Sequence, residues 1–202
     1  EPVGDDDVAA ILDDARFAPS GGNRQPWRVA VVNDVTIRRT LAELMRPVWN
    51  EYVAATSAGQ VPFNSIAYAP IHDAPQRSNA LLDRIDTIPV VLAIAADLRL
   101  IVAADADLQR VAIVPGASIY PFCWNVLLAA RARGLGGVLT TFASRVEPEL
   151  AAVLELPAHH ALAATIFLGR PVHQPTKLRR APVGDFASLD TFGGARFTGP
   201  VG

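Results

Sequence analysis

The sequence has a single cysteine, Cys123, so an intramolecular disulfide is excluded and the reducing cytoplasm is the expected location. Charged residues are also scarce: they make up 19% of the 202 residues, whereas hydrophobic residues make up 50%. The two signs nearly cancel, with 18 Lys and Arg against 20 Asp and Glu. We therefore predict no surface for nucleic acid or for an anionic membrane. So few charges favour burial of part of the surface against a partner subunit.

The residue patterns of acid–base, nucleophilic and metal catalysis are missing as well. The sequence shows no Ser/His/Asp set and no pair of carboxylates at a useful helical spacing. His72-Asp73 and His159-His160 lack the regular spacing of metal ligands. Cys123 lies in an apolar segment where nothing is expected to lower the pKa of its thiol. We expect no catalytic side chain and no metal ligand.

One stretch without charge, Val111–Ala130, has about the length of a transmembrane helix. Pro115 and Pro121 interrupt its first half, and residues 124–133 are typical of a helix that ends at Gly134. We interpret this second half as a buried core helix. The sequence thus predicts no membrane span, and no signal peptide is visible.

Hydrophobic periodicity and turn residues predict alternating helices and strands. Helices are expected over 8–16, from Asp34 onward, over 124–133 and over 148–154; strands are expected over 27–32, 88–96, 137–141 and 161–168. Pro47 is expected to break or kink the second helix. This order indicates one α/β or α+β domain over residues 1–202 with a mixed sheet. Residues 59–79 are predicted to form an excursion or lid, and residues 170–202 an extended tail.

The connection between the first helix and the first strand is rich in small polar residues. Ser20 and Asn23 have short polar side chains, Gly21 and Gly22 expose backbone amides, and Gln25 adds an amide. Such a loop suits hydrogen bonding to a heterocycle. Composition alone, however, favours an ordinary turn between a helix and a strand.

Glycines follow the central helix at Gly134, Gly136 and Gly137. A dinucleotide fingerprint needs a strand before its glycines and a helix after them, whereas here the helix comes first. These glycines are instead predicted to end the helix and to let a ligand lie against the next strand. In the tail, Lys177, Arg179 and Arg180 suit a phosphate group or form a solvated basic turn.

Together, three of these segments resemble the FMN-dependent nitroreductase family. Residues 15–27, Ala-Arg-Phe-Ala-Pro-Ser-Gly-Gly-Asn-Arg-Gln-Pro-Trp, resemble the signature loop of that family. Residues 118–136, with Ser-Ile-Tyr-Pro at 118–121 and Asn125, are similar to the buried helix of one branch. The basic residues of 177–180 lie where the family places cations. The three matches have the order and separation expected of the family and cover nearly the whole chain.

The resemblance implies an α+β fold with a mixed central sheet flanked by helices. It also implies an intertwined homodimer with two FMN sites at the interface and the tail packed on the partner subunit. In such proteins the signature loop reaches the flavin of the partner subunit, which implies contacts from Pro19, Ser20, Gly21, Asn23 and Gln25. The other residues implied to bind FMN are Leu139, Thr140 and Thr141 beside the flavin ring, and Lys177 and Arg179 at the phosphate.

The implied activity is hydride transfer from NAD(P)H through FMN to a nitroaromatic, quinone or similar electrophile, so the flavin carries the electrons. One alternative is another flavin chemistry on the same fold: flavin fragmentation, dehalogenation or oxidation of ring-containing peptides. A second is a degenerate dimer that only binds or sequesters flavin. This second alternative is motivated by a difference from the family. Family members carry an arginine-rich segment, similar to Arg-Arg-Ser-x-Arg, before the region matching Glu1–Val3, and this sequence does not contain it. Trp124 also stands where related sequences often have glutamine.

Overall fold

The computed structural model describes residues 1–198, which form two compact units. The first unit is Glu1–Pro171, and the second begins at Val172. The elements of the first unit are α1 (Asp5–Ala15), η1 (Gly21–Asn23), β1 (Trp27–Val31), α2 (Val35–Ser57), α3 (Ala80–Asp83), η2 (Ile85–Thr87), β2 (Val90–Asp97), η3 (Leu98–Leu100), η4 (Val114–Ser118), α4 (Tyr120–Ala132), β3 (Gly136–Thr140), α5 (Phe142–Arg145), α6 (Glu147–Val153) and β4 (His160–Gly169), where η marks a short 3₁₀ helix.

The four strands form one sheet in the order β1-β2-β4-β3, and each neighbouring pair is antiparallel. Strands β2 and β3 run in the same direction because α4 carries the chain back across the sheet between them. Strand β4, however, lies between these two. The predicted mixed sheet is therefore corrected: within the described residues, no two adjacent strands are parallel. The α+β class, with a sheet flanked by helices, is confirmed.

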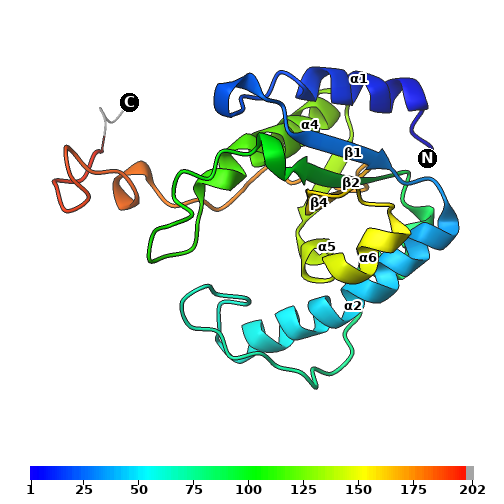
Figure 1. Ribbon diagram of the computed structural model, residues 1–202, viewed down its shortest axis with the longest axis horizontal. Helices are drawn as coiled ribbons and strands as arrows, with labels where there is room; N and C mark the ends of the chain where they lie inside the picture. The colour runs from blue at the N-terminus through cyan, green and yellow to red at the C-terminus, as the bar shows by residue number, and fades with distance from the viewer. Residues whose placement is uncertain (199–202) are drawn as a thin grey trace. The chain divides into compact units, whose positions relative to one another are not determined.

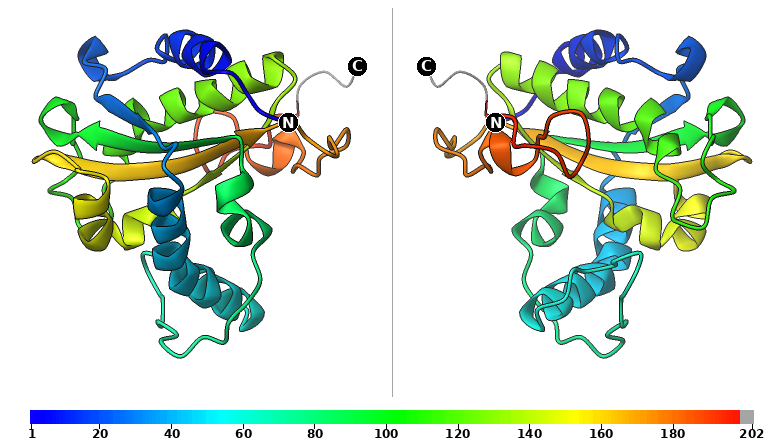
Figure 2. Two further views of the ribbon diagram at one scale, coloured as in Figure 1. Left: turned by 90° about the vertical axis from the view of Figure 1, so that its right-hand side faces the viewer. Right: turned by 90° about the vertical axis from the view of Figure 1, so that its left-hand side faces the viewer.

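Helices cover both faces of the sheet (Figure 1, Figure 2). Helices α1 and α4 pack on one face, and α2, α5 and α6 pack on the other. Strand β2 is buried along its whole length because its side chains alternate between the two cores. Val90, Leu92 and Ile94 pack under α1 and α4, whereas Val91 and Ala93 pack toward α2. This explains why the strand reads as a continuous apolar run.

Helix α2 continues through Pro47, so the predicted break is wrong. Proline cannot donate to the carbonyl of Glu43, one turn earlier. Both residues are exposed, and water can therefore satisfy that carbonyl. The predicted cap is present: the Asp34 carboxylate accepts two backbone N–H groups of the first turn, at 2.8 and 2.9 Å.

Helix α4 begins at Tyr120, four residues before the predicted start, and is followed by Gly134 in the left-handed conformation, with φ of +75°. One side of it packs in the core, as predicted, and the other side is exposed. The exposed large apolar residues of the helix are Tyr120, Trp124 and Leu128, and we call these residues the α4 stripe. Within residues 1–198, no helix combines the length and apolar character needed to cross a membrane.

The second unit contains the short helix η5 (Val183–Asp185) and an antiparallel bridge between Ser188 and Arg196. Several of its large apolar side chains are exposed, among them Phe186 and Phe192. Nearly all of the predicted tail, 170–202, falls in this unit. Its residues 199–202 lie outside the described residues.

Candidate functional site

The loop between α1 and β1 contains five of the predicted binding residues and is folded by its own side chains. The Ser20 hydroxyl accepts the N–H of Gln25 at 2.9 Å, which closes the turn around η1. The Arg24 guanidinium donates to the carbonyl of Gly21 at 2.8 Å. The N–H of Gly21, by contrast, points out of the loop and donates to Ser118 Oγ at 3.0 Å. The loop is thus held from within and by one side chain from elsewhere in the chain.

Two non-glycine residues of the loop have a left-handed backbone. The φ angle is +53° at Asn23 and +51° at Gln25, and it is +60° at Gly22. This conformation costs a residue with a side chain on the order of 1 kcal/mol, and backbone of this kind is concentrated at ligand-binding sites. The Gln25 side-chain amide donates to the Asn23 side-chain oxygen over a long distance, 3.4 Å, and both side chains are exposed to solvent.

Pro26 and Trp27 fix the end of the loop. The Pro26 carbonyl accepts the N–H of Asp97 at 2.8 Å, and the Trp27 ring stacks on Phe122 with centroids 4.8 Å apart. The Asp97 carboxylate is buried and accepts two bonds from the Arg99 guanidinium, at 2.9 and 2.7 Å. These bonds hold the pKa of the Asp97 carboxyl well below its usual range. The stacking of the Trp27 ring on Phe122 anchors the end of the loop to the core.

The start of α4 contacts both the loop and strand β4. Ser118, which holds the loop, lies two residues before Tyr120. The Tyr120 hydroxyl donates to the carbonyl of Ala163 in β4 at 3.3 Å. Two residues further along β4, Thr165 pairs with Thr140 at the end of β3. The two groups of predicted binding residues in the first unit therefore belong to opposite edge strands: the loop leads into β1, and Thr140 ends β3.

The predicted ring-facing residues Leu139, Thr140 and Thr141 lie at the end of the edge strand β3. Leu139 packs partly against the core under α4. The Thr140 hydroxyl is enclosed and has no hydrogen-bond partner within the described residues. An enclosed hydroxyl without a partner costs about 1–3 kcal/mol. A polar ligand at the end of β3 would supply the missing bond.

The two glycines that begin β3, Gly136 and Gly137, serve packing, which corrects the prediction that they leave room for a ligand. A Cβ added at Gly137 would lie 2.6 Å from Leu127 Cδ2 and 2.7 Å from Leu168 Cδ2. One added at Gly136 would lie 3.3 Å from Pro171 Cβ. The space above both glycines is therefore filled by neighbouring side chains. Their conformation and size allow α4 and β4 to approach each other closely.

Three consecutive residues of α2 anchor the segment between α2 and α3. The Trp49 indole donates to the carbonyl of Ser78 at 3.1 Å. The side-chain oxygen of Asn50 accepts the N–H of Arg77 at 2.9 Å. Glu51 accepts the hydroxyl of Tyr68 at 2.6 Å. Loss of solvent contact, together with the bond to Glu51, raises the pKa of Tyr68 to about 12. The predicted lid over 59–79 remains a prediction, and its second half is the anchored part.

Lys177 and Arg179, the predicted phosphate ligands, belong to the second unit. Both side chains are exposed, and neither forms an ion pair within the described residues. Their contact with a phosphate remains a prediction.

Cys123 is buried in the core, and burial raises the pKa of its thiol to about 12. It is therefore not a nucleophile. Within residues 1–198, no group of three or more His, Cys, Asp or Glu side chains is placed to hold a metal ion.

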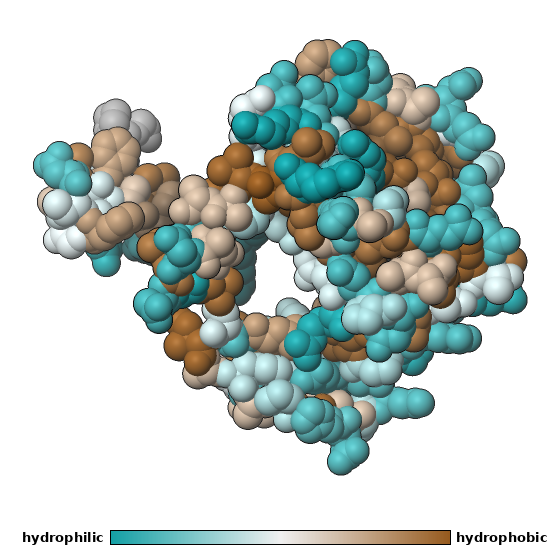
Figure 3. Space-filling model, viewed as in Figure 1, coloured by the Kyte–Doolittle hydropathy of each residue, from teal (hydrophilic) through white to brown (hydrophobic). Residues whose placement is uncertain are grey.

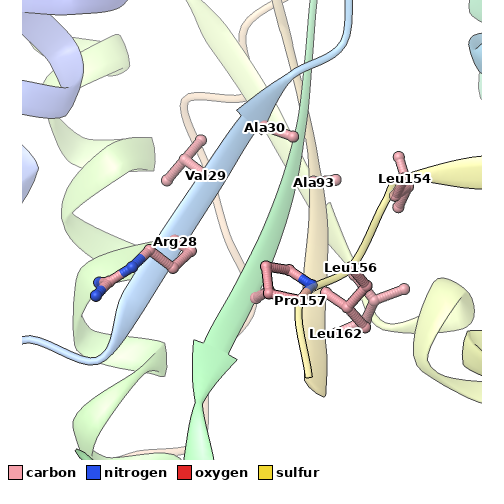
Figure 4. Close-up of a pocket in the computed structure, with 9 residues that line it drawn as sticks. Arg28, Val29, Ala30, Ala93, Leu154, Leu156, Pro157 and Leu162 are labelled. Carbon is pink, nitrogen blue, oxygen red and sulfur yellow. The ribbon is translucent and has the colours of Figure 1, made fainter. Parts of the chain in front are cut away.

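A cavity on the opposite side of the sheet differs chemically from this region (Figure 4). Its lining is apolar and comes from β1, β2, the start of β4 and the connection after α6: Val29, Ala30, Ala93, Ala95, Leu154, Leu156, Pro157 and Leu162, with Arg28 at its edge. The Arg28 guanidinium points away from the apolar residues and donates to the carbonyl of Trp27 at 2.8 Å. No polar group is therefore directed at a ligand there.

The loop and the end of β3 fit the heterocycle of a flavin. The flavin ring system needs both hydrogen-bond donors and acceptors around its polar edge, and the amides of Asn23 and Gln25 supply both. The unpartnered Thr140 hydroxyl adds one further group. Ser118 and Tyr120 were not among the predicted site residues, although the sequence analysis singled out the motif that contains them. Their roles depend on partners far away in the chain.

Comparisons with known proteins agree with this geometry. A family model described as "Nitroreductase family" matches residues 1–170. An NADH dehydrogenase of Thermus thermophilus is 29% identical over 185 residues, covering 91% of this chain and 84% of that protein. A 5,6-dimethylbenzimidazole synthase of Rhodospirillum rubrum is 28% identical, covering 85% and 74%. A nitrobenzene nitroreductase of Ectopseudomonas oleovorans is 27% identical, covering 84% and 78%.

The fold is also found among solved structures. The NADPH:FMN oxidoreductase of Vibrio harveyi, solved in complex with NAD⁺, superimposes with a TM-score of 0.66 at 17% identity. The match covers 95% of this chain and 70% of that protein.

Proposed function

Because the chain belongs to the nitroreductase family, we propose that it is an oxidoreductase that passes a hydride from NAD(P)H to a nitroaromatic, quinone or similar electrophile. The observation that carries the proposal is the 19–25 loop, in which the left-handed residues Asn23 and Gln25 place two exposed side-chain amides next to each other. When bound, FMN supplies the ring that accepts and donates the hydride.

Several predictions from the sequence are confirmed at the level of the family. These are the recognition of the family itself, the class of NAD(P)H-dependent flavin oxidoreductase, and FMN with NAD(P)H as the cofactor and co-substrate. The acceptor is the part that we propose here, together with the residues of the site.

We assign the flavin contacts to the side chains and backbone of this chain as follows. Asn23 and Gln25 bond the polar edge of the ring, and Thr140 gains the partner that its hydroxyl lacks. The remaining proposed contacts are Pro19, Ser20, Gly21, Leu139 and Thr141 around the ring, and Lys177 and Arg179 at the phosphate. In this arrangement the chain binds and orients the cofactor, and no side chain needs to act as an acid or a base.

We further propose that the α4 stripe is the contact surface of a homodimer. Tyr120, Trp124 and Leu128 recur every fourth residue, so they form one apolar line along the helix. Their exposed fractions are 44%, 59% and 49%, and Ile113 beside them is 72% exposed. Apolar residues reach the surface elsewhere as well (Figure 3). A second copy of the chain would cover this line.

The C-terminal tail is proposed to pack on the partner subunit, as the sequence predicted. Phe186 and Phe192 support this proposal, because both rings are left in water within the second unit. A cytoplasmic location is part of the same proposal and is supported by the single free cysteine.

A second candidate function has one observation in its favour. A relative that is 28% identical is named 5,6-dimethylbenzimidazole synthase, so another flavin chemistry is present among proteins similar to this chain. The two candidates differ in nicotinamide consumption with an added electrophile. A reductase oxidises NAD(P)H in proportion to the acceptor that it reduces.

The first experiment is the absorbance spectrum of the purified full chain, followed by assays with NADH and NADPH. We expect bands near about 370 and 450 nm from a flavin that acid releases and that is identified as FMN. Addition of a nitroaromatic or a quinone should then cause stoichiometric oxidation of NAD(P)H. Failure to take up added FMN would contradict the flavoenzyme. Uptake of FMN without nicotinamide oxidation would contradict the reductase and favour the second candidate.

A further inference from the structure

We propose that Ser118 is the positioning residue of the loop between α1 and β1. By accepting the N–H of Gly21, its hydroxyl fixes the loop in the shape that receives the cofactor and ties that shape to the start of α4. The identity of the ligand rests on the proposed function. The role of Ser118 in placing the loop does not depend on which ligand binds there.

Ser118 is well placed for this role because it is 4% exposed and ends η4, directly before α4. It lies 97 positions from Gly21 in the chain. The two residues also touch. A Cβ added at Gly21 would lie 3.4 Å from Ser118 Oγ and 3.1 Å from Val102 Cγ2. The Gly21 backbone therefore rests directly on the Ser118 side chain, where water cannot replace the hydroxyl without movement of the loop.

Within the described residues, the other side-chain hydrogen bonds of the loop are internal to it. Ser20 bonds Gln25, and Arg24 bonds Gly21. Internal bonds fix the shape of the turn but not its position on the protein. Trp27 fixes the loop where it enters β1, and Ser118 is the side chain from outside that fixes it at Gly21.

The strained residues of the loop depend on this support. Asn23 and Gln25, with φ of +53° and +51°, follow Gly21 closely. A strained backbone persists only where its surroundings hold it in place. Without the Ser118 hydroxyl, the Gly21 N–H loses its acceptor, and the loop is free to relax into conformations with less strain. The amides proposed to bond the flavin would then be displaced.

Ser118 also connects the loop to the proposed dimer surface, because the α4 stripe begins two residues later at Tyr120. An ordered start of α4 thus serves both the loop and the contact with a second copy.

The test compares Ser118→Ala with Ser78→Ala in the full chain. The control also removes one serine hydroxyl, which donates to Asp83 at 2.6 Å in the segment before α3. Two quantities are measured: the Kd for FMN from quenching of flavin fluorescence, and the hydrogen exchange of the Gly21 amide without FMN. Ser118→Ala should weaken FMN binding about five- to tenfold, the effect of one lost hydrogen bond, and should speed exchange at Gly21. Ser78→Ala should change neither, and Ser118→Thr, which keeps the hydroxyl, should restore both.

The outcomes separate this inference from the proposed function. If the wild-type chain binds no FMN, the proposed function is overturned, and exchange at Gly21 alone decides whether Ser118 holds the loop. If Ser118→Ala binds FMN as tightly as the wild type, the positioning role is overturned. If Ser118→Ala does not fold by circular dichroism, Gly21→Ala replaces it, since the added Cβ lifts the loop off Val102 and Ser118. An unchanged Kd in that variant also overturns the inference.

Discussion

Gln25 has a backbone conformation that glutamine does not favour, with φ of +51°. Glycine adopts this conformation without a steric cost, and asparagine tolerates it better than glutamine does. A side chain kept at such a position gives up stability, and in return an amide is placed next to that of Asn23. Strain of this kind is typical of sites where binding matters more than stability.

Gln25→Gly should therefore raise the free energy of unfolding by about 0.5–1 kcal/mol, because relief of the left-handed strain exceeds the entropy that glycine adds to the unfolded chain. The same change should weaken FMN binding by removing an amide. Urea denaturation and fluorescence titration measure the two effects. Gln109→Gly is the control, since Gln109 is exposed and not left-handed. It should lower the stability slightly and leave the Kd unchanged. A stability loss in Gln25→Gly equal to that of the control would contradict the strain argument.

Asp97 makes the stability depend on pH in the acidic range. Its carboxyl ionises more readily in the folded protein than in the unfolded chain, where it titrates near about pH 4. Its contribution to the free energy of unfolding is thus fully present above that pH and is lost as the pH falls toward the lowered pKa. Asp97→Asn should lower the stability at pH 7 and make the loss below about pH 4 shallower.

Urea midpoints measured at several pH values between 3 and 7 test this expectation. Asp73→Asn is the control, because Asp73 is exposed and forms no ion pair within the described residues. It should keep the slope of the wild type. An Asp97→Asn variant with the wild-type slope would show that the bonds from Arg99 do not stabilise the folded state.

At the residue scale, the sequence predicts side-chain chemistry better than backbone shape. The short polar side chains at Ser20, Asn23 and Gln25 indicated a binding loop, and the structure places them in one turn. Nothing in the sequence predicted the left-handed conformation of Gln25, because glycine and asparagine are the residue types that indicate it. Ser118 was missed as a loop anchor for a different reason: its partner is distant in the sequence.

At the scale of the elements, the attachment of helix α2 to the sheet depends on one buried charged side chain, Arg38. Arg38 is 7% exposed, and its guanidinium donates to the carbonyls of Val32, Ile88 and Pro89 at 2.7, 2.6 and 3.4 Å. These carbonyls flank the end of β1 and the start of β2, so the side chain joins the helix to both strands. Burial lowers the pKa of the guanidinium, which nevertheless keeps its charge in this range.

Arg38→Met should destabilise the protein by about 2–4 kcal/mol, because three carbonyls lose a charged donor. The adjacent Arg39→Met is a matched control. Arg39 pairs with Asp86 at 3.0 Å, but its side chain is 62% exposed, so the expected change is within about 0.5 kcal/mol. Denaturation curves of both variants measure the two changes in the free energy of unfolding. Equal effects of the two substitutions would contradict the role assigned to Arg38.

Periodicity predicted the existence of the principal helices and strands because each buries a regular face. It did not predict the order of the strands, which depends on where β4 inserts between β2 and β3. It also placed the start of α4 too late, since Tyr120 and Pro121 read as part of a turn. Proline is in fact well suited to the first turn of a helix, where no internal donor is needed.

At the scale of the whole molecule, the composition and the structure agree on a surface that is apolar for a single chain. The low share of charged residues predicted a covered surface, and the α4 stripe is the place where that surface is most regular. Charge counts give the amount of such surface but not its position. The position that we propose for it follows from the packing of α4 on the sheet by its other side.

Trp124→Glu should convert the proposed dimer to a monomer, because a carboxylate would be buried in the middle of the α4 stripe. Sedimentation equilibrium measures the mass, and tryptophan fluorescence of the wild type should shift to shorter wavelength as the dimer forms. Val35→Glu provides the control: Val35 is 43% exposed and lies at the start of α2, away from the stripe. A Trp124→Glu variant with the mass of the wild type would place the interface elsewhere.

The anchoring of the segment between α2 and α3 also determines where the molecule tolerates additional sequence. Trp49, Asn50 and Glu51 hold the later part of that segment, and the Phe63 ring packs against Tyr52 and Arg145. At the tip, by contrast, Ile66 has a side chain 93% exposed and lies in the local turn formed by Asn64. A short peptide inserted at this tip would extend into solvent without disturbing the sheet. The tip is therefore a suitable attachment point for an affinity tag or a fluorophore.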